Sequence, residues 1–439
     1  MKVTYSHMRL LTVLFACTTL LAQVPNQPPV KSADGLWLVA PKSEDSLLSL
    51  TRSFSQGLTI DSENNVWTMV TEYRAKEPDN RDVWLYRSKD GGKAWQRVTK
   101  FPGKWSANGA IAGEPGKQIL HAGWAAHLDG KAYTSAVYQQ YDAGQGVWLG
   151  EPEVLQKGSN DQDQYSVSDL ALDADGLVTA LVATHRRPKR PPWPSGWSSG
   201  FMIREPGKGD AAWAGPFPVH TNTHGFWANL QIRDGKAHTS YRSSPGGSII
   251  GYRSFSLADQ KYDQNKDVEI SVQPKTGRHV ANASSLVVGP FGNRTVLYSA
   301  AAPGQRGAAN GQLLIAHAGD DDKWHTEVLC DDPKMKSGNV SHEHFALVQG
   351  PGAQAIALYS KVSEDFQVLY RRILENGKPM DKEREIARSD VGGAYYRIVA
   401  MRDARVRSGV WAVVAGVREG EALGIRAVLA PRPPKPRWH

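Results

Sequence analysis

The sequence predicts an all-β protein that forms a single β-propeller of seven four-stranded blades. The composition, with 42 glycines, 26 prolines and 14 tryptophans in 439 residues, is typical of many short strands joined by turns. One sequence pattern recurs along the chain: a short apolar strand, a turn containing Gly, Asp or Asn, a longer strand with a polar end, and a third strand. Repeats with a period of about 50 residues indicate an array or a propeller.

The pattern occurs seven times, and its successive starts are separated by 51, 60, 61, 54, 60 and 55 residues. These starts are Phe54, Trp105, Tyr165, Phe226, Val280, Val340 and Tyr395. The segment GLWLVAP at 35–41 precedes the first pass and has no partner of its own, so we expect it to supply the outermost strand of the last blade. Such closure leaves only short, protected strand edges, and the propeller is expected to span residues 35–430.

Both ends of the chain lie outside the repeats. Lys2 and Arg9 precede an apolar run that ends at residue 22, which predicts a secretory signal at 1–22, followed by a linker at 23–34. A non-cleaved anchor is the alternative, although the run is short for a membrane span, so we expect no stable membrane insertion after cleavage. The prolines and basic residues at 431–439 predict a disordered basic tail.

Export and cysteine content together limit the kinds of site that the mature chain could hold. Removal of Cys17 with the signal leaves only Cys330, so we expect no intramolecular disulfide and no cysteine cluster for zinc. The expected product is a secreted or periplasmic monomer without a cofactor, and a structural calcium ion stays open.

The charge pattern favours an acidic glycan as the partner. The net charge of +8 includes Lys2 and Arg9, so the mature chain carries about 8 − 2 = +6, spread along the sequence. The densest basic stretch, HRRPKR, contains His185 and Arg186. In an exported protein this stretch fits an acidic polysaccharide or oligosaccharide better than nucleic acid, and a solvated loop is the alternative interpretation.

The stretch SKDGGKAW matches the pattern SxDxGxxW through Ser88, Asp90, Gly92 and Trp95. The serine and aspartate side chains can bond turn amides, the glycine allows the chain to reverse, and the tryptophan can bury between strands. The motif resembles the Asp box, or bacterial neuraminidase repeat, of sialidases and other sugar-active propellers. Near-copies keep only an aromatic residue, at Trp148, Trp213, Tyr262 and Trp324. The resemblance implies an outer turn away from the active site, so we expect a structural role for this motif.

Binding residues of a propeller are expected where each innermost strand begins and each second strand ends. Positions selected by this rule are rich in Arg, His and Tyr, and their only obvious acids are Glu72 and Asp169. The catalytic candidates are Arg242, Tyr241, His224, His127, Glu72 and Arg74. The substrate-binding candidates are Trp227, Asn229, His185, Arg186, Asn282, His342, His344, Tyr396 and Arg397. The same rule also selects Tyr359 and Lys361.

Three histidines and two tryptophans need separate interpretations. His342 and His344 have the i, i+2 spacing of a metal-ligand pair, but no third ligand is evident, so no metal site is predicted. His121 lies in an apolar strand and is expected to be a hydrogen-bonded core residue. Trp193 and Trp197 suit either a sugar-stacking platform or packing within their loop.

The chain also resembles propeller polysaccharide lyases of the ulvan lyase type, with the match resting on position in the blade. Lyase chemistry needs a cation to neutralise the uronate carboxylate, a base for the C5 proton and an acid for the leaving oxygen. The resemblance implies that Arg242 neutralises the carboxylate and that Tyr241, His224 or His127 carries protons. We therefore expect a secreted enzyme that cleaves a uronate-containing glycan by β-elimination.

Two alternatives stay open. A sialidase-like exo-acting glycoside hydrolase would hold the sugar carboxylate with Arg74, Arg242 and Arg397. It would use Tyr241 or Tyr396 as the nucleophile and Glu72 as its partner, but the FRIP-type motif that carries the family's first arginine is absent. A non-catalytic propeller that binds glycans or organises an envelope complex is favoured by the lack of an acid pair, because one scaffold hosts unrelated functions.

Overall fold

The computed structural model of the chain is all-β in its described part. It describes residues 30–31, 37–40, 46–50, 57–74, 77–92, 94–103, 109–128, 133–159, 164–184, 193, 198–204, 213–220, 224–244, 249–263, 268–271, 281–301, 311–318, 323–330, 345–350, 352–362, 367–389, 394–401, 410–417 and 423–429. These ranges contain strands and turns but no helix, and hence no helix that could cross a membrane. The predicted signal, linker and tail lie outside them, apart from the strand β1 (Val30–Lys31).

The described strands form seven antiparallel sheets, numbered here in chain order. Sheet 1 joins β3 (Ser46–Leu50), β4 (Leu58–Ile60), β5 (Val66–Arg74), β6 (Glu77–Ser88) and β7 (Gln96–Lys100). Sheet 2 joins β8 (Gly109–Gly113), β9 (Ile119–His127), β10 (Thr134–Asp142) and β11 (Val147–Gln156). Sheet 3 joins β12 (Tyr165–Leu172), β13 (Val178–Thr184), β14 (Ser199–Arg204) and β15 (Trp213–Pro218).

The second half of the chain repeats this order. Sheet 4 joins β16 (His224–Arg233), β17 (Lys236–Ser244), β18 (Ile249–Ser256), β19 (Lys261–Tyr262) and β20 (Val268–Glu269). Sheet 5 joins β21 (Ala281–Val288), β22 (Arg294–Ala301), β23 (Gly311–Ala318) and β24 (Trp324–Cys330). Sheet 6 joins β25 (Phe345–Gln349), β26 (Gln354–Val362), β27 (Gln367–Glu375), β28 (Lys378–Pro379) and β29 (Arg384–Ser389). Sheet 7 joins β30 (Ala394–Ala400), β31 (Val410–Val417), β32 (Leu423–Leu429), β2 (Trp37–Ala40) and β1.

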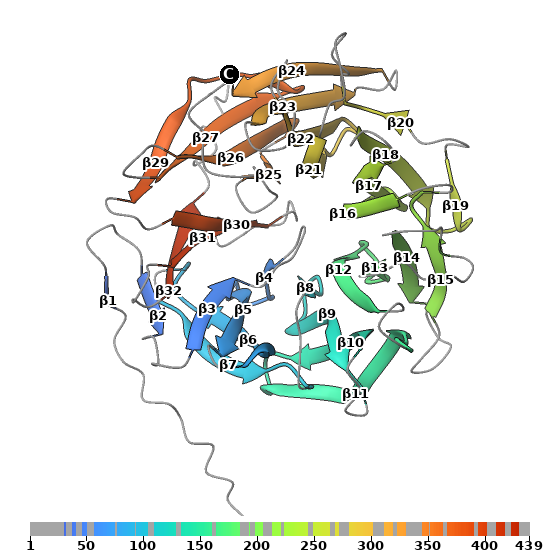
Figure 1. Ribbon diagram of the computed structural model, residues 1–439, viewed down its shortest axis with the longest axis vertical. Helices are drawn as coiled ribbons and strands as arrows, with labels where there is room; N and C mark the ends of the chain where they lie inside the picture. The colour runs from blue at the N-terminus through green and yellow to red at the C-terminus, as the bar shows by residue number, and fades with distance from the viewer. Residues whose placement is uncertain are drawn as a thin grey trace, which may run out of the picture.

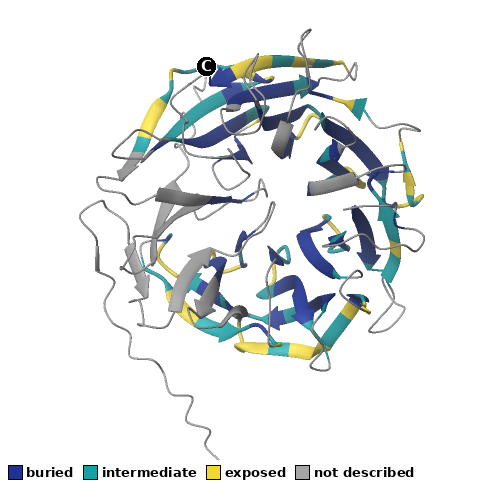
Figure 2. Ribbon diagram, viewed as in Figure 1, coloured by how far each residue is buried: buried dark blue, intermediate teal, exposed yellow. Residues whose placement is uncertain are grey.

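The sheets follow one another around a ring (Figure 1). In sheet 7 the strand β2 pairs antiparallel with β32, so segments from the two ends of the chain lie side by side. Strands near the centre of the ring are largely buried, and exposed residues gather on the outer strands (Figure 2). In each sheet the first strand begins at the same edge at which the second strand ends, and we call this edge the mouth end. His127, Thr184 and Ser244 are the last residues of their strands at this edge.

Hydrogen bonds between neighbouring first strands hold the inner part of the ring together. The Thr59 hydroxyl accepts the Gly113 N–H at 2.7 Å, and the Ser285 hydroxyl accepts the Leu347 N–H at 3.0 Å. Asp169 has no exposed surface, and its carboxylate accepts the N–H of Leu170 within its own strand and that of Leu230 in the next sheet. Because both oxygens are satisfied by backbone donors, Asp169 joins two sheets and does not present a free acid at the mouth end.

The recurring aromatic residues join the outer strands. In sheet 2, Trp148 Nε1 donates to the Lys100 carbonyl of sheet 1 at 3.2 Å. In sheet 4, the Tyr262 hydroxyl donates to the Phe217 carbonyl of sheet 3 at 3.1 Å. Trp213 and Trp324 likewise contact the preceding sheet. These aromatics therefore fasten each sheet to the one before it.

The turn at Ser88 makes the hydrogen bonds that its residues predict. The Ser88 hydroxyl donates to Asp90 Oδ1 at 2.8 Å, the Gly92 N–H donates to the Ser88 hydroxyl at 2.7 Å, and the Ala94 N–H donates to Asp90 Oδ1 at 2.9 Å. Gly92 has φ of 86°, a conformation that favours glycine. Trp95 is half-buried, less than the expected burial. Ser88 pairs with the first residue of β5, so the turn lies at the end of sheet 1 away from the mouth end.

Candidate functional site

The structure describes the side chains of some predicted site residues, only the backbone of others, and neither for the rest. Side chains are described for Arg242, Tyr241, His127 and Asn229. Only the backbone is described for Glu72 and Arg74 in β5, His224 and Trp227 in β16, Asn282 in β21, and Tyr396 and Arg397 in β30. His185, Arg186, His342 and His344 lie outside the described residues, as does Trp197.

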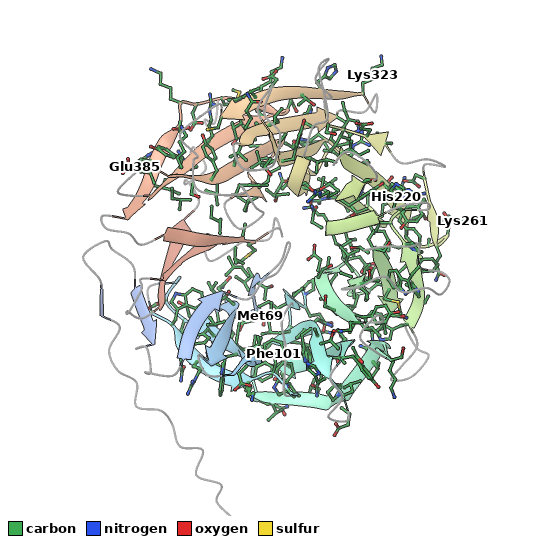
Figure 3. All side chains as sticks on the ribbon, viewed as in Figure 1. Met69, Phe101, His220, Lys261, Lys323 and Glu385 are labelled. Atoms are coloured by element: carbon green, nitrogen blue, oxygen red, sulfur yellow. The ribbon has the colours of Figure 1, made fainter. Side chains whose placement is uncertain are left out.

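Tyr241 belongs to the core between sheets 3 and 4. It has no exposed surface and packs in one cluster with Leu181 and Phe201 of sheet 3. Its ring lies against Gly251 of the neighbouring strand, where an added Cβ would come within 2.7 Å of the ring. The Tyr241 ring also makes an edge-to-face contact with His220, with centroids 6.0 Å apart and an interplanar angle of 88°. His220 lies nearer the centre of the ring than Lys261, which is on its outer edge (Figure 3).

Arg242 faces the opposite neighbour, because successive residues of a strand point to opposite faces. It pairs with Ile250, which packs against Leu286 and Tyr298 of sheet 5. Arg242 is half-buried, and loss of solvent lowers the pKa of its guanidinium below the ordinary value. An arginine nevertheless stays cationic at neutral pH. Arg242 therefore places a fixed positive charge at the mouth end of the interface between sheets 4 and 5.

A buried polar network lies directly below Arg242 on the same face. Ser240 precedes Arg242 by two positions, and its hydroxyl lies 3.0 Å from that of Ser284 in sheet 5. The Asn229 amide donates to the Ser240 hydroxyl at 2.8 Å and to the Ser284 carbonyl at 3.2 Å. The described contacts of Asn229 are thus with protein, and they fix sheet 4 to sheet 5 beneath the arginine. Its predicted contact with substrate stays a prediction.

His127 occupies the mouth end of sheet 2. It is the last residue of β9, pairs with Thr134 and is half-buried. Arg242 and His127 thus share one end of the ring but belong to different interfaces, while Tyr241 and Arg242 diverge. In the described ranges no three His, Cys, Asp or Glu side chains gather in a way that would hold a metal ion.

Sheet 6 contains a polar cluster of Tyr359, Lys361 and Glu383, of which the sequence predicted only the first two as positions at the mouth end. Glu383 accepts the Tyr359 hydroxyl at 2.6 Å and Lys361 Nζ at 2.7 Å. Lys361 Nζ also lies 4.9 Å from the ring centroid of Tyr370. Burial, followed by the bond to Glu383, raises the pKa of Tyr359. Strand position selected Tyr359 and Lys361, but no sequence pattern places Glu383, which lies outside a strand, beside β26.

Two other predictions from the sequence can be checked against burial. His121 is 2% exposed, and its Nδ1 lies 2.6 Å from the Tyr138 hydroxyl and its Nε2 3.3 Å from Glu114 Oε2. A neutral imidazole that accepts at Nδ1 and donates at Nε2 satisfies both contacts, which confirms the core interpretation. Trp193 is 6% exposed and packs against Tyr165, with ring centroids 5.7 Å apart. The loop-packing alternative is therefore correct for Trp193.

Comparisons with solved structures match the fold. An ulvan lyase, described as a new family of polysaccharide lyase, is 11% identical and has a TM-score of 0.57, with 89% of this chain and 95% of that chain covered. An ulvan lyase structure bound to an oligosaccharide of glucuronate and sulfated rhamnose is 11% identical and has a TM-score of 0.52, with 87% and 96% covered. Trypanosoma rangeli sialidase is 12% identical and has a TM-score of 0.45, with 78% and 56% covered.

No protein-family model matches the chain, and no curated protein matches it. The all-β architecture of antiparallel sheets is confirmed and agrees with these propeller structures. The predicted resemblance to propellers of the ulvan lyase type is confirmed at the level of the fold.

Proposed function

We propose that the protein is a carbohydrate-active enzyme that cleaves a uronate-containing glycan by β-elimination. The observation that carries the proposal is Arg242, a half-buried cation at the mouth end, held above the network of Asn229, Ser240 and Ser284. A preorganised cation stabilises negative charge as it develops on the sugar carboxylate, and it does so more strongly where water is partly excluded. The fold shared with ulvan lyases supports this choice among glycan-active enzymes.

In the proposed reaction Arg242 neutralises the uronate carboxylate and makes the C5 proton easier to remove. A base takes this proton, its bonding electrons form the C4–C5 double bond, and the C4–O bond breaks as an acid protonates the leaving oxygen. His224 is the first candidate for proton transfer, because Phe226 pairs with Arg242 and His224 with Ser244, two positions nearer the mouth end. His127 is the second candidate. Tyr241, predicted from the sequence as a third, is left out of the proposed step, because it has no exposed surface and packs against sheet 3 on the face opposite Arg242.

The remaining predictions accompany this proposal. Glu72 and Arg74 would act from sheet 1, and the other substrate-binding candidates would line the mouth end. We also propose that each sheet is one blade of a seven-bladed ring, with β2 beside β32 as its closure. Export as a monomer belongs to the same proposal.

One observation favours a second candidate, a non-catalytic propeller that binds glycans. Tyr241 and Arg242 lie on opposite faces of β17, so these two residues do not converge on one sugar in the described structure. A protein that only binds the glycan would need the Arg242 cation and polar side chains around it, but no acid and base for proton transfer.

The test is ultraviolet absorbance of the conjugated unsaturated uronate during incubation with a panel of uronate-containing polysaccharides. The wild-type protein should produce this signal, and Arg242→Ala should lower the rate by about a hundredfold or more. Arg97→Ala is the control, because Arg97 is exposed on the outer strand β7 and should leave the rate unchanged. Release of reducing sugar without absorbance would support a hydrolase, and binding without turnover would support the second candidate.

A further inference from the structure

The interface between sheets 1 and 2 contains two buried hydrogen-bond donors without an acceptor in the part of the chain that the structure describes. Tyr141 is 1% exposed, and its hydroxyl has no hydrogen-bond partner there. Nε of Arg87 is buried and lacks a partner as well, although Nη2 of the same guanidinium donates to Gln96 Oε1 at 3.3 Å. Most buried polar atoms are hydrogen-bonded, so two such donors in one interface need an explanation.

Both donors lie around one indole ring. Arg87 pairs with Trp67 between β5 and β6, and its guanidinium carbon lies 5.4 Å from the centroid of the Trp67 ring. The Tyr141 ring meets the same indole edge-on, with centroids 5.9 Å apart. Trp67 and Tyr141 belong to one core cluster with Met69 and Phe101, which mark this interface in Figure 3. The positive charge of Arg87 also reaches Tyr141, because it opposes the rise that burial causes in the pKa of this tyrosine.

An exposed turn and an exposed side chain cover these donors. Residues 144–146, between β10 and β11, are exposed, and a Cβ added to Gly146 would lie 3.8 Å from the Tyr141 hydroxyl. On the side of sheet 1, Arg87 is half-buried, and Gln96, which accepts from it, is exposed on β7. A ligand that replaces the Gln96 amide would therefore approach the guanidinium and the hydroxyl from solvent.

The carboxylates next to this site are bonded elsewhere. Asp142 Oδ1 accepts two backbone N–H groups of its own turn, at 2.9 and 2.8 Å. Asp61 Oδ1 accepts two backbone N–H groups, and its Oδ2 accepts Trp67 Nε1 at 2.9 Å. Neither forms a described ion pair with Arg87. In the interface of sheets 2 and 3, by contrast, the Glu153 carboxylate accepts from an arginine and a tryptophan. The interface of sheets 1 and 2 thus has the cation and a second donor without an anionic acceptor of this kind.

We infer that Arg87 and Tyr141 form a binding site for an oxyanion, either a sulfate ester or a carboxylate of a glycan, away from the mouth end. Tyr141 is the last residue but one of β10, which begins opposite His127 at the mouth end. Arg87 Nε and the Tyr141 hydroxyl donate to the anion, which displaces Gln96 from Nη2. Charge-assisted hydrogen bonds are stronger than the bond to the neutral amide. Oxyanion binding is independent of the proposed function, and only the assignment of the anion to a glycan rests on it.

The test is thermal unfolding of the full chain in sodium sulfate, compared with sodium chloride of equal ionic strength. Sulfate should raise the Tm of the wild type in a saturable way, because a ligand that binds only the folded state stabilises it. Arg87→Gln and Tyr141→Phe should each raise the apparent Kd for sulfate about tenfold. Without sulfate, Tyr141→Phe should unfold at or above the Tm of the wild type, because it loses no described hydrogen bond.

Arg97→Gln is the matched control. Arg97 pairs with Tyr86, so it lies on the opposite face of sheet 1 from Arg87, and its guanidinium carbon lies 4.2 Å from the ring centroid of Trp84. This variant removes the same charge from a similar stacked position, and it should keep the sulfate Kd of the wild type.

Gln96→Ala tests the displacement step, because it removes the neutral acceptor with which the anion competes. Its sulfate Kd should fall two- to threefold, and a higher Kd would overturn the assigned geometry. Sulfate also stabilises proteins generally through exclusion from their surface. Equal sulfate-dependent shifts of Tm in the wild type, Arg87→Gln and Tyr141→Phe would show an adventitious ion only and would overturn the site.

Titration calorimetry with sodium sulfate and with sodium glucuronate identifies the anion. Binding of sulfate alone assigns the site to a sulfate ester, binding of glucuronate alone assigns it to a carboxylate, and binding of neither overturns it. Elimination at the mouth end is a separate measurement. Tyr141→Phe should cleave a short uronate oligosaccharide as fast as the wild type. If the wild type produces no unsaturated uronate but binds sulfate through Arg87, the lyase proposal fails and the oxyanion site stands.

Discussion

The interface between sheets 2 and 3 and the interface between sheets 4 and 5 are built on one frame. In each, a histidine of the second strand contacts a tyrosine of the third: His121 Nδ1 lies 2.6 Å from the Tyr138 hydroxyl, and His238 Nδ1 lies 2.7 Å from the Tyr252 hydroxyl. The next sheet then adds a tryptophan. Trp213 packs on Tyr138 and Trp324 packs on Tyr252, each with ring centroids 5.1 Å apart.

The two interfaces differ at one outer-strand position. Glu153 pairs with Tyr138 in sheet 2, and Val268 pairs with Tyr252 in sheet 4. The Glu153 carboxylate accepts Arg204 Nη2 and Trp213 Nε1, each at 2.7 Å. Val268 offers no such acceptor to the cation and the tryptophan of the next sheet. The comparison teaches that the repeat keeps the ring contacts, while the outer-strand residue that pairs with the tyrosine is an acid in one interface and an apolar residue in the other.

The buried histidines of the two interfaces also have different charged neighbours. Burial lowers the pKa of His121, but the hydrogen bond to Glu114 opposes this shift, and the same bond holds the pKa of Glu114 at about 2. Burial lowers the pKa of His238 to about 4, and the positive charges of Arg294 and Lys236 act in the same direction. Asp263 and the Arg233 carbonyl oppose the shift only in part. Acid should therefore weaken the interface of sheets 4 and 5.

The largest expected effect is the loss of stability through His238 on acidification. An unfolded histidine titrates near pH 6.5, so the depressed folded value gives stability that is complete above about pH 6.5 and is lost as the pH falls towards 4. The shift corresponds to about 3 kcal/mol of unfolding free energy. Urea unfolding across this range should show a clearly flatter pH dependence for His238→Gln than for the wild type.

His121→Gln is the matched control for this experiment. Its pH dependence should also become flatter than that of the wild type, because burial lowers the pKa of His121 as well, while the Glu114 carboxylate opposes that shift. Equal changes in the two variants would mean that the carboxylate does not distinguish the interfaces.

The next effect is removal of the carboxylate itself. Glu153→Ala should lower the free energy of unfolding by about 2 kcal/mol, because it leaves Arg204 and the Trp213 indole N–H without the acceptor they use now. Val268→Ala at the corresponding position should cost about 1 kcal/mol through lost apolar contact. Urea unfolding at neutral pH measures both, and a smaller loss for Glu153→Ala would contradict the comparison.

The sequence predicted the repeating strands and turns well, because residues close together in the sequence determine them. The glycine and aspartate turns and the regular spacing predicted an all-β chain, and Ser88 with Asp90 forms the predicted turn. His121 was predictable as a core residue, because the apolar residues on both sides of it in β9 require burial.

Contacts between sheets were not predictable, because they join residues about 60 positions apart. Asp169 was selected as an acid of the mouth end, but its partner is the Leu230 N–H, 61 residues away. Glu153 reaches Trp213 over 60 residues in the same way. The alternation of a strand did imply that Tyr241 and Arg242 point apart. Only the packing of the sheets shows that Tyr241 faces sheet 3 and that Arg242 faces sheet 5.

The smallest expected effect comes from placing a carboxylate at the position of sheet 4 that corresponds to Glu153 of sheet 2. Val268→Glu would place an acid beside Tyr252, where Arg294 lies 5.7 Å from the tyrosine ring and 5.9 Å from the ring of Trp324. Val268 is only half-buried, so the cost of desolvating the new charge is limited. We expect a gain of up to about 1 kcal/mol relative to Val268→Gln, which has the same shape without the charge. A charged variant less stable than the neutral one would show that the cation between sheets 4 and 5 is already compensated, and that the difference between the interfaces lies in shape and not in charge.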